Sequence, residues 1–144
     1  MTEKYFLHRI KLDNNTYTKG IEIHDTQESA IRSYHAQMTQ AFGNTSYPNV
    51  TFVSCKITDI YNNTLAPFNE TWNPSGAADK FFLHHIRQDG ENFTKDIDIL
   101  DTFDAAKLAF HQNEAYGYNN SKFPNVNYVA CFITDKSGHV LLPY

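Results

Sequence analysis

Glycine is scarce in this chain, with six residues in 144. A backbone cradle for phosphate groups needs closely spaced glycines, and the sequence contains no Gly-rich phosphate loop. It also contains no Gly-x-Ser-x-Gly turn and no His-Glu-x-x-His helix, which mark serine hydrolases and zinc proteases. The sequence therefore gives no motif for nucleotide binding or for either class of hydrolase.

Clustered positive charge is also missing. The chain carries 12 basic and 16 acidic residues, a formal net charge of -4, and no basic run is longer than two residues. Nucleic-acid binders neutralise phosphates with a basic face, and anionic membranes attract such a face as well. No stretch approaches the roughly 18 apolar residues that a membrane helix needs. We expect neither a nucleic-acid partner nor a membrane partner.

Cysteine is limited to two residues, and neither stands near a second cysteine or a histidine with the spacing of a metal site. No metal and no cofactor are expected. Cys55 lies between Val53 and Ile57 on an apolar strand face, as Cys131 does in the second half, which predicts core packing. The first residues lack the basic-then-apolar run of a signal peptide, so we expect a cytoplasmic protein with free thiols.

The chain is a tandem duplication. When the sequence is shifted by 76 residues, 4–68 aligns with 80–144 without a gap, and 25 of the 65 pairs are identical. We assign the first repeat to 1–68 and the second to 80–144. The segment 69–79 contains a proline and a glycine and lacks periodicity, which indicates a linker.

Each repeat is predicted to have the order ββαββ, described here for the first copy. Residues 5–12 and 17–24 alternate in polarity around turn-forming residues, which predicts a hairpin. A helix is expected after Asp25, which stands three residues before an acidic residue in the spacing of a capping box. Further strands are predicted over 53–57 and around Leu65. The helix is expected to bury apolar residues that recur at helical spacing, namely Ala30, Tyr34, Met38 and Phe42.

The fold class is therefore α+β, with antiparallel sheets and one helix in each repeat. A unit of about 65 residues would bury only about 60% of its surface and be marginally stable. We expect the repeats to share one core in a pseudo-twofold arrangement. The sequence leaves open whether they form one continuous sheet or two packed sheets.

Histidine is the first candidate for a functional role, because His8 and His84 occupy the same position in the two repeats. Each shares its strand face with apolar residues, which is typical of a hydrogen-bonded core histidine. The alternative is that the pair lines a central pocket and acts there as an acid or base.

Three further residues are candidate binding residues. Lys19 and Lys95 are equivalent lysines on the apolar face of the second strand, where each can lay its stem over apolar surface or bind an anion. Trp72, the single tryptophan, stands in the expected linker. It is predicted either to pack the linker onto a repeat or to anchor a partner.

These observations favour a non-catalytic binding module that holds a small ligand or a protein partner in a cleft between the repeats. By association with other small acidic proteins, an accessory protein of a bacterium or phage is expected. One alternative is a small enzyme with His8 and His84 in a central pocket. Another is a structural subunit of an assembly, for which a homodimer is the simplest form.

Overall fold

The computed structural model describes residues 3–41, 45–65, 70–117 and 122–143. The chain divides into two compact units, the first mainly Met1–Ala78 and the second mainly Asp79–Asp135. Within these described residues each unit contains one four-stranded antiparallel sheet and one α-helix, which confirms the α+β class and the repeated layout. No helix among the described residues is long and apolar enough to cross a membrane.

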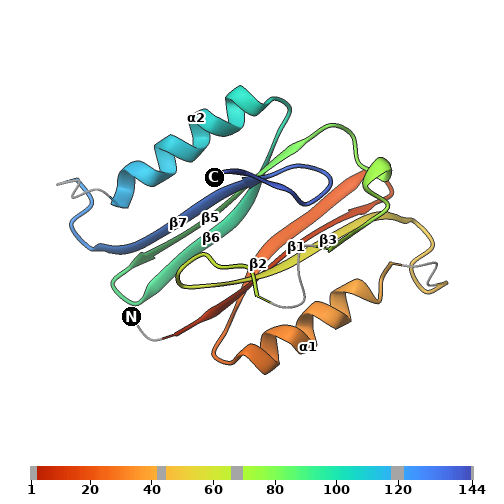
Figure 1. The fold of residues 1–144 in the computed structure, drawn as a ribbon, viewed down its shortest axis with the longest axis horizontal. Coiled ribbons are helices and arrows are strands. Elements are labelled where there is room, and N and C mark those ends of the chain that lie inside the picture. Colours follow the sequence, from red (N-terminus) through yellow and green to blue (C-terminus); the bar gives the residue numbers. More distant parts are fainter. Residues whose placement is uncertain (1–2, 42–44, 66–69, 118–121, 144) are drawn as a thin grey trace. The chain divides into compact units, whose positions relative to one another are not determined.

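The first unit has the strand order β2-β1-β3-β4. Helix α1 runs along one face of this sheet (Figure 1). Its elements are β1 (Tyr5–Asp13), β2 (Thr16–His24), α1 (Gln27–Met38), β3 (Val50–Asp59), β4 (Glu70–Trp72) and the short 3-10 helix η1 (Pro74–Gly76).

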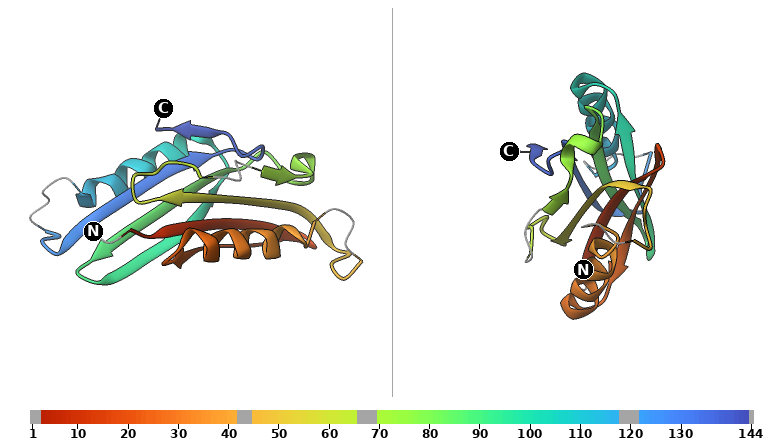
Figure 2. Two further views of the ribbon diagram at one scale, coloured as in Figure 1. Left: turned by 60° about the horizontal axis from the view of Figure 1, so that its bottom comes forward. Right: turned by 90° about the vertical axis from the view of Figure 1, so that its right-hand side faces the viewer.

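The second unit repeats this plan with the order β6-β5-β7-β8. Helix α2 again runs along one face of its own sheet, as the left view of Figure 2 shows. Its elements are β5 (Phe81–Asp89), β6 (Asn92–Leu100), α2 (Phe103–Glu114), the 3-10 helix η2 (Ala115–Gly117), β7 (Val126–Thr134) and β8 (Val140–Leu142).

Both predicted hairpins are present. In the first unit the turn between β1 and β2 is made by Asn14 and Asn15, whose φ angles are 51° and 69°. In the second unit Gly90 has a φ angle of 61° at the equivalent turn. Asparagine and glycine tolerate these left-handed angles better than other residues, so the turn residues set the register of each hairpin.

The helix starts differ from the prediction by one residue. Thr26 and Thr102 are the N-caps, and their hydroxyls accept hydrogen bonds of 3.1 Å from the backbone N–H groups of Ser29 and Ala105. The preceding aspartates do not cap the helices. Asp25 instead accepts a hydrogen bond from Lys4, and the equivalent pair in the second unit does the same.

A hydrophobic core lies between the helix and the sheet in each unit. In the first unit the predicted helix residues Ala30, Tyr34 and Met38 are buried there, while Phe42 lies outside the described residues. The strands contribute Leu7, Val53, Cys55 and Ile57. In the second unit the same core contains Leu83, Ala106, Phe110, Cys131 and Ile133.

The fourth strand of the first sheet comes from an unexpected segment. The chain near Leu65 forms only one isolated bridge, from Thr64 to Thr58, together with the hydrogen bond from the Leu65 N–H to the Ile57 carbonyl. The strand itself is β4, Glu70–Trp72, which belongs to the expected linker and pairs with Val53–Cys55. The linker prediction is corrected for these residues. In the second unit the predicted strand around Leu141 is present as β8.

Candidate functional site

His8 is a buried residue of β1, on the sheet face that carries no helix. Its side chain is 1% exposed, and its Nε2 lies 2.8 Å from the Thr58 hydroxyl in a hydrogen bond. Burial, reinforced by the charge of Lys56, lowers the pKa of His8 to about 3. An imidazole with this pKa stays neutral at physiological pH and does not cycle its proton there. The residue therefore fits the packing interpretation.

His84 repeats this arrangement in the second unit. It is 3% exposed, and its Nε2 lies 2.8 Å from the Thr134 hydroxyl. Its ring also stacks on Phe132, with 4.2 Å between ring centroids. Phe132 occupies the position that Lys56 holds in the first unit. The two histidines therefore make equivalent hydrogen bonds to threonine but have different neighbours.

The cysteines are packed thiols, as the sequence predicts. Cys55 and Cys131 are both buried and free. Burial raises the pKa of each thiol to about 12. Because the thiolate is the reactive form, neither sulfur is poised as a nucleophile. No group of three His, Cys, Asp or Glu side chains converges on a metal position in the part of the chain that the structure describes.

The remaining predicted binding residues are not brought into one site within a unit. Lys19 is half-buried and Lys95 is exposed, each on the sheet face that carries no helix. Trp72 lies on the opposite face of the first sheet, half-buried against the helix-bearing core. This packing agrees with the interpretation that it fixes its segment to a repeat.

A polar network in the first unit was not predicted from the sequence. Glu22 lies at its centre: its Oε2 is 3.2 Å from Arg9 Nε, and its Oε1 accepts from the Ser33 hydroxyl at 2.6 Å. His24 Nε2 lies 3.0 Å from the same Oε1, and His24 Nδ1 lies 2.8 Å from the Ser29 hydroxyl. Burial raises the pKa of Glu22, but these hydrogen bonds and the Arg9 charge outweigh it, so the pKa is lowered. The network fastens β2 to the first turns of α1.

The second unit replaces this network as a whole. His24 is replaced by Leu100, and the two serines are replaced by Ala105 and Ala109. The arginine–glutamate pair is replaced by His85 and Asp98, which lie 3.3 Å apart. Leu100 and Ala109 pack against the apolar core there. The sequence does carry a signal for this network, namely the joint change of all these aligned positions between the repeats. A comparison restricted to identical pairs does not detect it.

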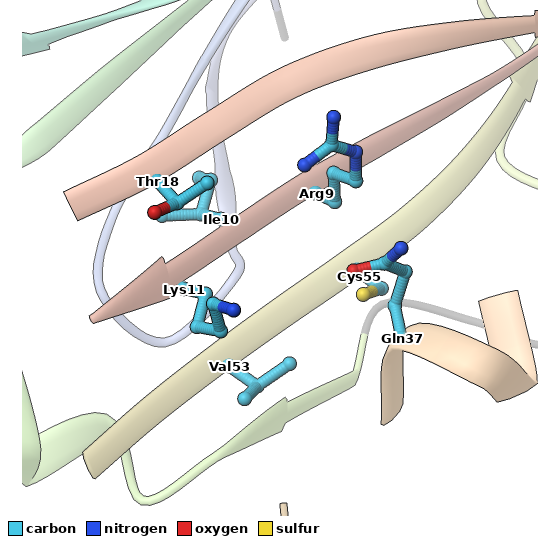
Figure 3. A pocket seen from close by; sticks show the side chains of 7 residues that line it. All are labelled: Arg9, Ile10, Lys11, Thr18, Gln37, Val53 and Cys55. Carbon is cyan, nitrogen blue, oxygen red and sulfur yellow. The ribbon is translucent and has the colours of Figure 1, made fainter. Parts of the chain in front are cut away.

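A small cavity lies beside the network, between β1, β3 and the end of α1 (Figure 3). Its volume is about 20 Å³, room for about one water molecule. Cys55 and Gln37 line it, and Lys11 donates a 2.8 Å hydrogen bond to Gln40 close by. A cavity of this size does not accommodate an organic ligand.

The outer edge of the long third strand differs between the two units. In the first unit β4 pairs with Val53–Cys55 of β3. A Cβ placed on Gly76 would stand 2.1 Å from the Thr51 carbonyl oxygen, so the chain after β4 also presses against this edge. In the second unit β8 (Val140–Leu142) pairs with Ile133 and Thr134 of β7. No strand among the described residues pairs with 129–131.

The first unit shows which backbone N–H and C=O groups of the third strand point to its outer edge, and the repeat transfers this pattern to β7. The Ile57 carbonyl accepts from Leu65, so the backbone groups of Ile57 point to the outer edge. In an antiparallel pair alternate residues present both groups to the same neighbour, so Val53 also faces outward, towards β4. By the same register the N–H and C=O groups of Val129 and Cys131 face the open edge of β7.

Side-chain exposure agrees with this difference. Val50 and Val53 are 5% and 2% exposed in the first unit, whereas the equivalent Val126 and Val129 are half-buried. A groove of about 290 Å³ lies at this point. Its walls are Glu114, Gly117, Val126, Asn127, Tyr128 and Val129, all within the second unit.

Sequence differences between the repeats open the groove. Gly117 stands where the first unit has Ala41, a core residue that is 2% exposed. Glu114 stands where the first unit has the core residue Met38. A smaller residue and a polar residue thus replace two parts of the first unit's core beside the open edge.

Comparison of the chain with protein-family models, with curated proteins and with solved structures gives no match.

Proposed function

We propose that this protein is a non-catalytic binding module that takes up an extended segment of a partner protein as an additional strand on β7. The observation that carries the proposal is the difference between the two repeats. The first covers the outer edge of its third strand with β4, and the second leaves the same edge without a strand among the described residues, beside a groove.

Strand addition suits this edge for two physical reasons. Outward-facing backbone groups supply hydrogen bonds that do not depend on the sequence of the partner, and side-chain pockets supply selectivity. An unpaired edge is also costly to leave bare, because it invites uncontrolled association. A specific partner strand satisfies the backbone groups of Val129 and Cys131 and covers the half-buried Val126 at the same time.

The residues of the alternative, a small enzyme, do not support it. His8 is buried and its pKa of about 3 keeps it neutral at physiological pH, and the two thiols are buried with raised pKa values. The groove in the second unit contains neither of these residue types.

The test is a selection of displayed random octapeptides on the wild-type protein and on two variants. Val129→Pro removes the N–H group that faces the open edge and leaves the hydrogen bonds between β5 and β7 in place. Val129→Thr keeps that N–H group and the β-branched shape, and serves as the matched control. We expect peptides that the wild-type protein and Val129→Thr enrich and that Val129→Pro does not.

The proposal is wrong if the wild-type protein enriches no peptide, or if Val129→Pro enriches the same peptides equally well. Chemical-shift mapping of an enriched peptide on the wild-type protein makes the result independent of how well Val129→Pro folds. The shifts should fall on 126–131, and shifts confined to other strands would contradict the site.

A further inference from the structure

We infer that the segment added to β7 carries a basic side chain, lysine or arginine, that pairs with Glu114. This inference rests on the proposed function and names the chemistry of the partner. Its basis is that the carboxylate beside this edge belongs to the added strand in the first repeat and to the helix in the second.

In the first unit the carboxylate belongs to the added strand. Glu70 of β4 accepts a hydrogen bond from the hydroxyl of Tyr34, which projects from α1. The helix position one turn later is Met38, 5% exposed in the core. The helix thus offers a donor and an apolar surface, and the strand that covers the edge supplies the acid.

In the second unit these roles are reversed. Phe110 replaces Tyr34, so the hydroxyl that would receive an acidic strand is gone. Glu114 replaces Met38, so the helix itself now presents a carboxylate in the wall of the groove. An acidic strand would place two carboxylates together, which costs free energy, whereas a basic strand completes a pair.

Glu114 has no hydrogen bond or ion pair among the residues that the structure describes. Burial raises the pKa of its carboxyl, and the charge of His111, one helical turn earlier, lowers it to a smaller extent. A carboxylate that is partly removed from water, with no hydrogen-bonded cation among the described residues, is stabilised by a cation that arrives from a ligand.

The pairing geometry points a partner side chain at this carboxylate. In the first unit Trp72 lies opposite Val53, and its side chain packs against the helix-bearing core. A residue placed opposite Val129 projects to the same face by the same register. Glu114 and Val129 line one groove, so the side chain between them meets a carboxylate.

The groove also suits the shape of a long basic residue. Val126 and Val129 give it apolar walls for a methylene stem, and Glu114 provides a site for the charged end. The second repeat adds a favourable field, because its residues 79–144 carry nine acidic and six basic side chains. Arginine has the additional advantage that its guanidinium can bind a carboxylate through two parallel hydrogen bonds.

The experiment uses the peptides selected on the wild-type protein. We expect lysine or arginine at one fixed position in the enriched set. The dissociation constant of one such peptide, measured by fluorescence anisotropy, should rise about tenfold or more for Glu114→Gln, the range for losing a hydrogen bond to a charged group. Glu91→Gln removes the same charge from an exposed turn of the second unit and should leave the dissociation constant unchanged.

The outcomes separate this inference from the proposed function. Enriched peptides that lack a basic position, and that bind Glu114→Gln as tightly as the wild type, overturn the inference and leave strand addition standing. A failure to enrich any peptide on the wild-type protein overturns the proposed function itself. A dimer of the protein that dissociates in Val129→Pro would identify a second copy as the occupant, and would overturn the inference of a separate basic partner.

Discussion

Acidification below about pH 6.5 should destabilise the protein through His8. The side chain is 1% exposed and hydrogen-bonded to Thr58, and its pKa is about 3 in the folded protein. In the unfolded chain a histidine has a pKa of about 6.5. As the pH falls below that value, the unfolded state takes up a proton that the folded state refuses.

The sign and the magnitude follow from this difference. The pKa of a base is lower in the folded state, so the contribution of neutral His8 is complete above about pH 6.5 and declines as the pH falls towards 3. Each pH unit in this window removes about 1.4 kcal/mol, so the free energy of unfolding should fall by about 2 kcal/mol at pH 5. Typical domains have only about 5–15 kcal/mol in total, so the loss is large enough to measure.

Urea denaturation at several pH values between 7 and 5 measures this effect, with the fluorescence of Trp72 as the signal. His8→Gln is the comparison, because glutamine can bond to Thr58 and does not titrate. The slope of stability against pH should be shallower in His8→Gln than in the wild type by about 1.4 kcal/mol per pH unit. Contributions from all other groups cancel in this difference.

Equal slopes for the wild type and His8→Gln would refute the reasoning, because they would mean that His8 takes up its proton in the folded state as well. A proton NMR titration of the His8 ring in the wild-type protein tests the same point without any variant. Its signals should stay constant from pH 8 to pH 5, and a shift with a midpoint near 6.5 would contradict the burial.

Three further results are expected. Tyr34→Phe removes the hydroxyl that holds Glu70, so it should lower the free energy of unfolding by about 1 kcal/mol and raise the amide exchange rates of β4; unchanged exchange in β4 would contradict this. The two cysteine thiols, with pKa values near 12, should react with iodoacetamide at pH 8 only after unfolding, and rapid labelling of native protein would show that they are accessible. His24→Leu should lower the free energy of unfolding by about 1–3 kcal/mol, because Glu22 and Ser29 each lose a hydrogen-bond partner. Placing the second unit's residues at 24, 29 and 33 together should lower it by less than the sum of the single changes. A mutant cycle measured by urea denaturation tests this.

Local patterns in the sequence predicted most of each unit. The hairpins follow from alternation and turn residues, and Ala30, Tyr34 and Met38 mark the buried face of α1 correctly. The predicted N-cap lies one residue too early. Asp25 has the residue type and spacing of a capping residue, but the hydroxyl of Thr26 is the group that accepts the hydrogen bond from the Ser29 N–H. That distinction depends on backbone angles that the sequence does not show.

The features at the sheet edge depend on distant residues and were therefore missed. Glu70–Trp72 is too short to show any periodicity, and it is held as a strand by Tyr34, 36 positions away, and by the core beneath Trp72. The groove beside β7 arises in the same way, from the absence of such a strand among the described residues and from substitutions on α2 and η2. The linker composition of 69–79 gave the opposite indication, because a proline and a glycine suit the end of an edge strand as well as a linker.

The polar network around Glu22 also bears on how a duplicated chain reaches the correct fold. Tandem copies with similar sequences risk misassembly, in which a hairpin from one copy docks on the helix of the other. The hairpin carrying Glu22 and His24 would meet Ala105 and Ala109 on α2, and would bury its polar groups without the serine hydroxyls that satisfy them. The divergence between the copies therefore disfavours docking of the first hairpin on α2, because that contact would leave Glu22 and His24 without their serine partners.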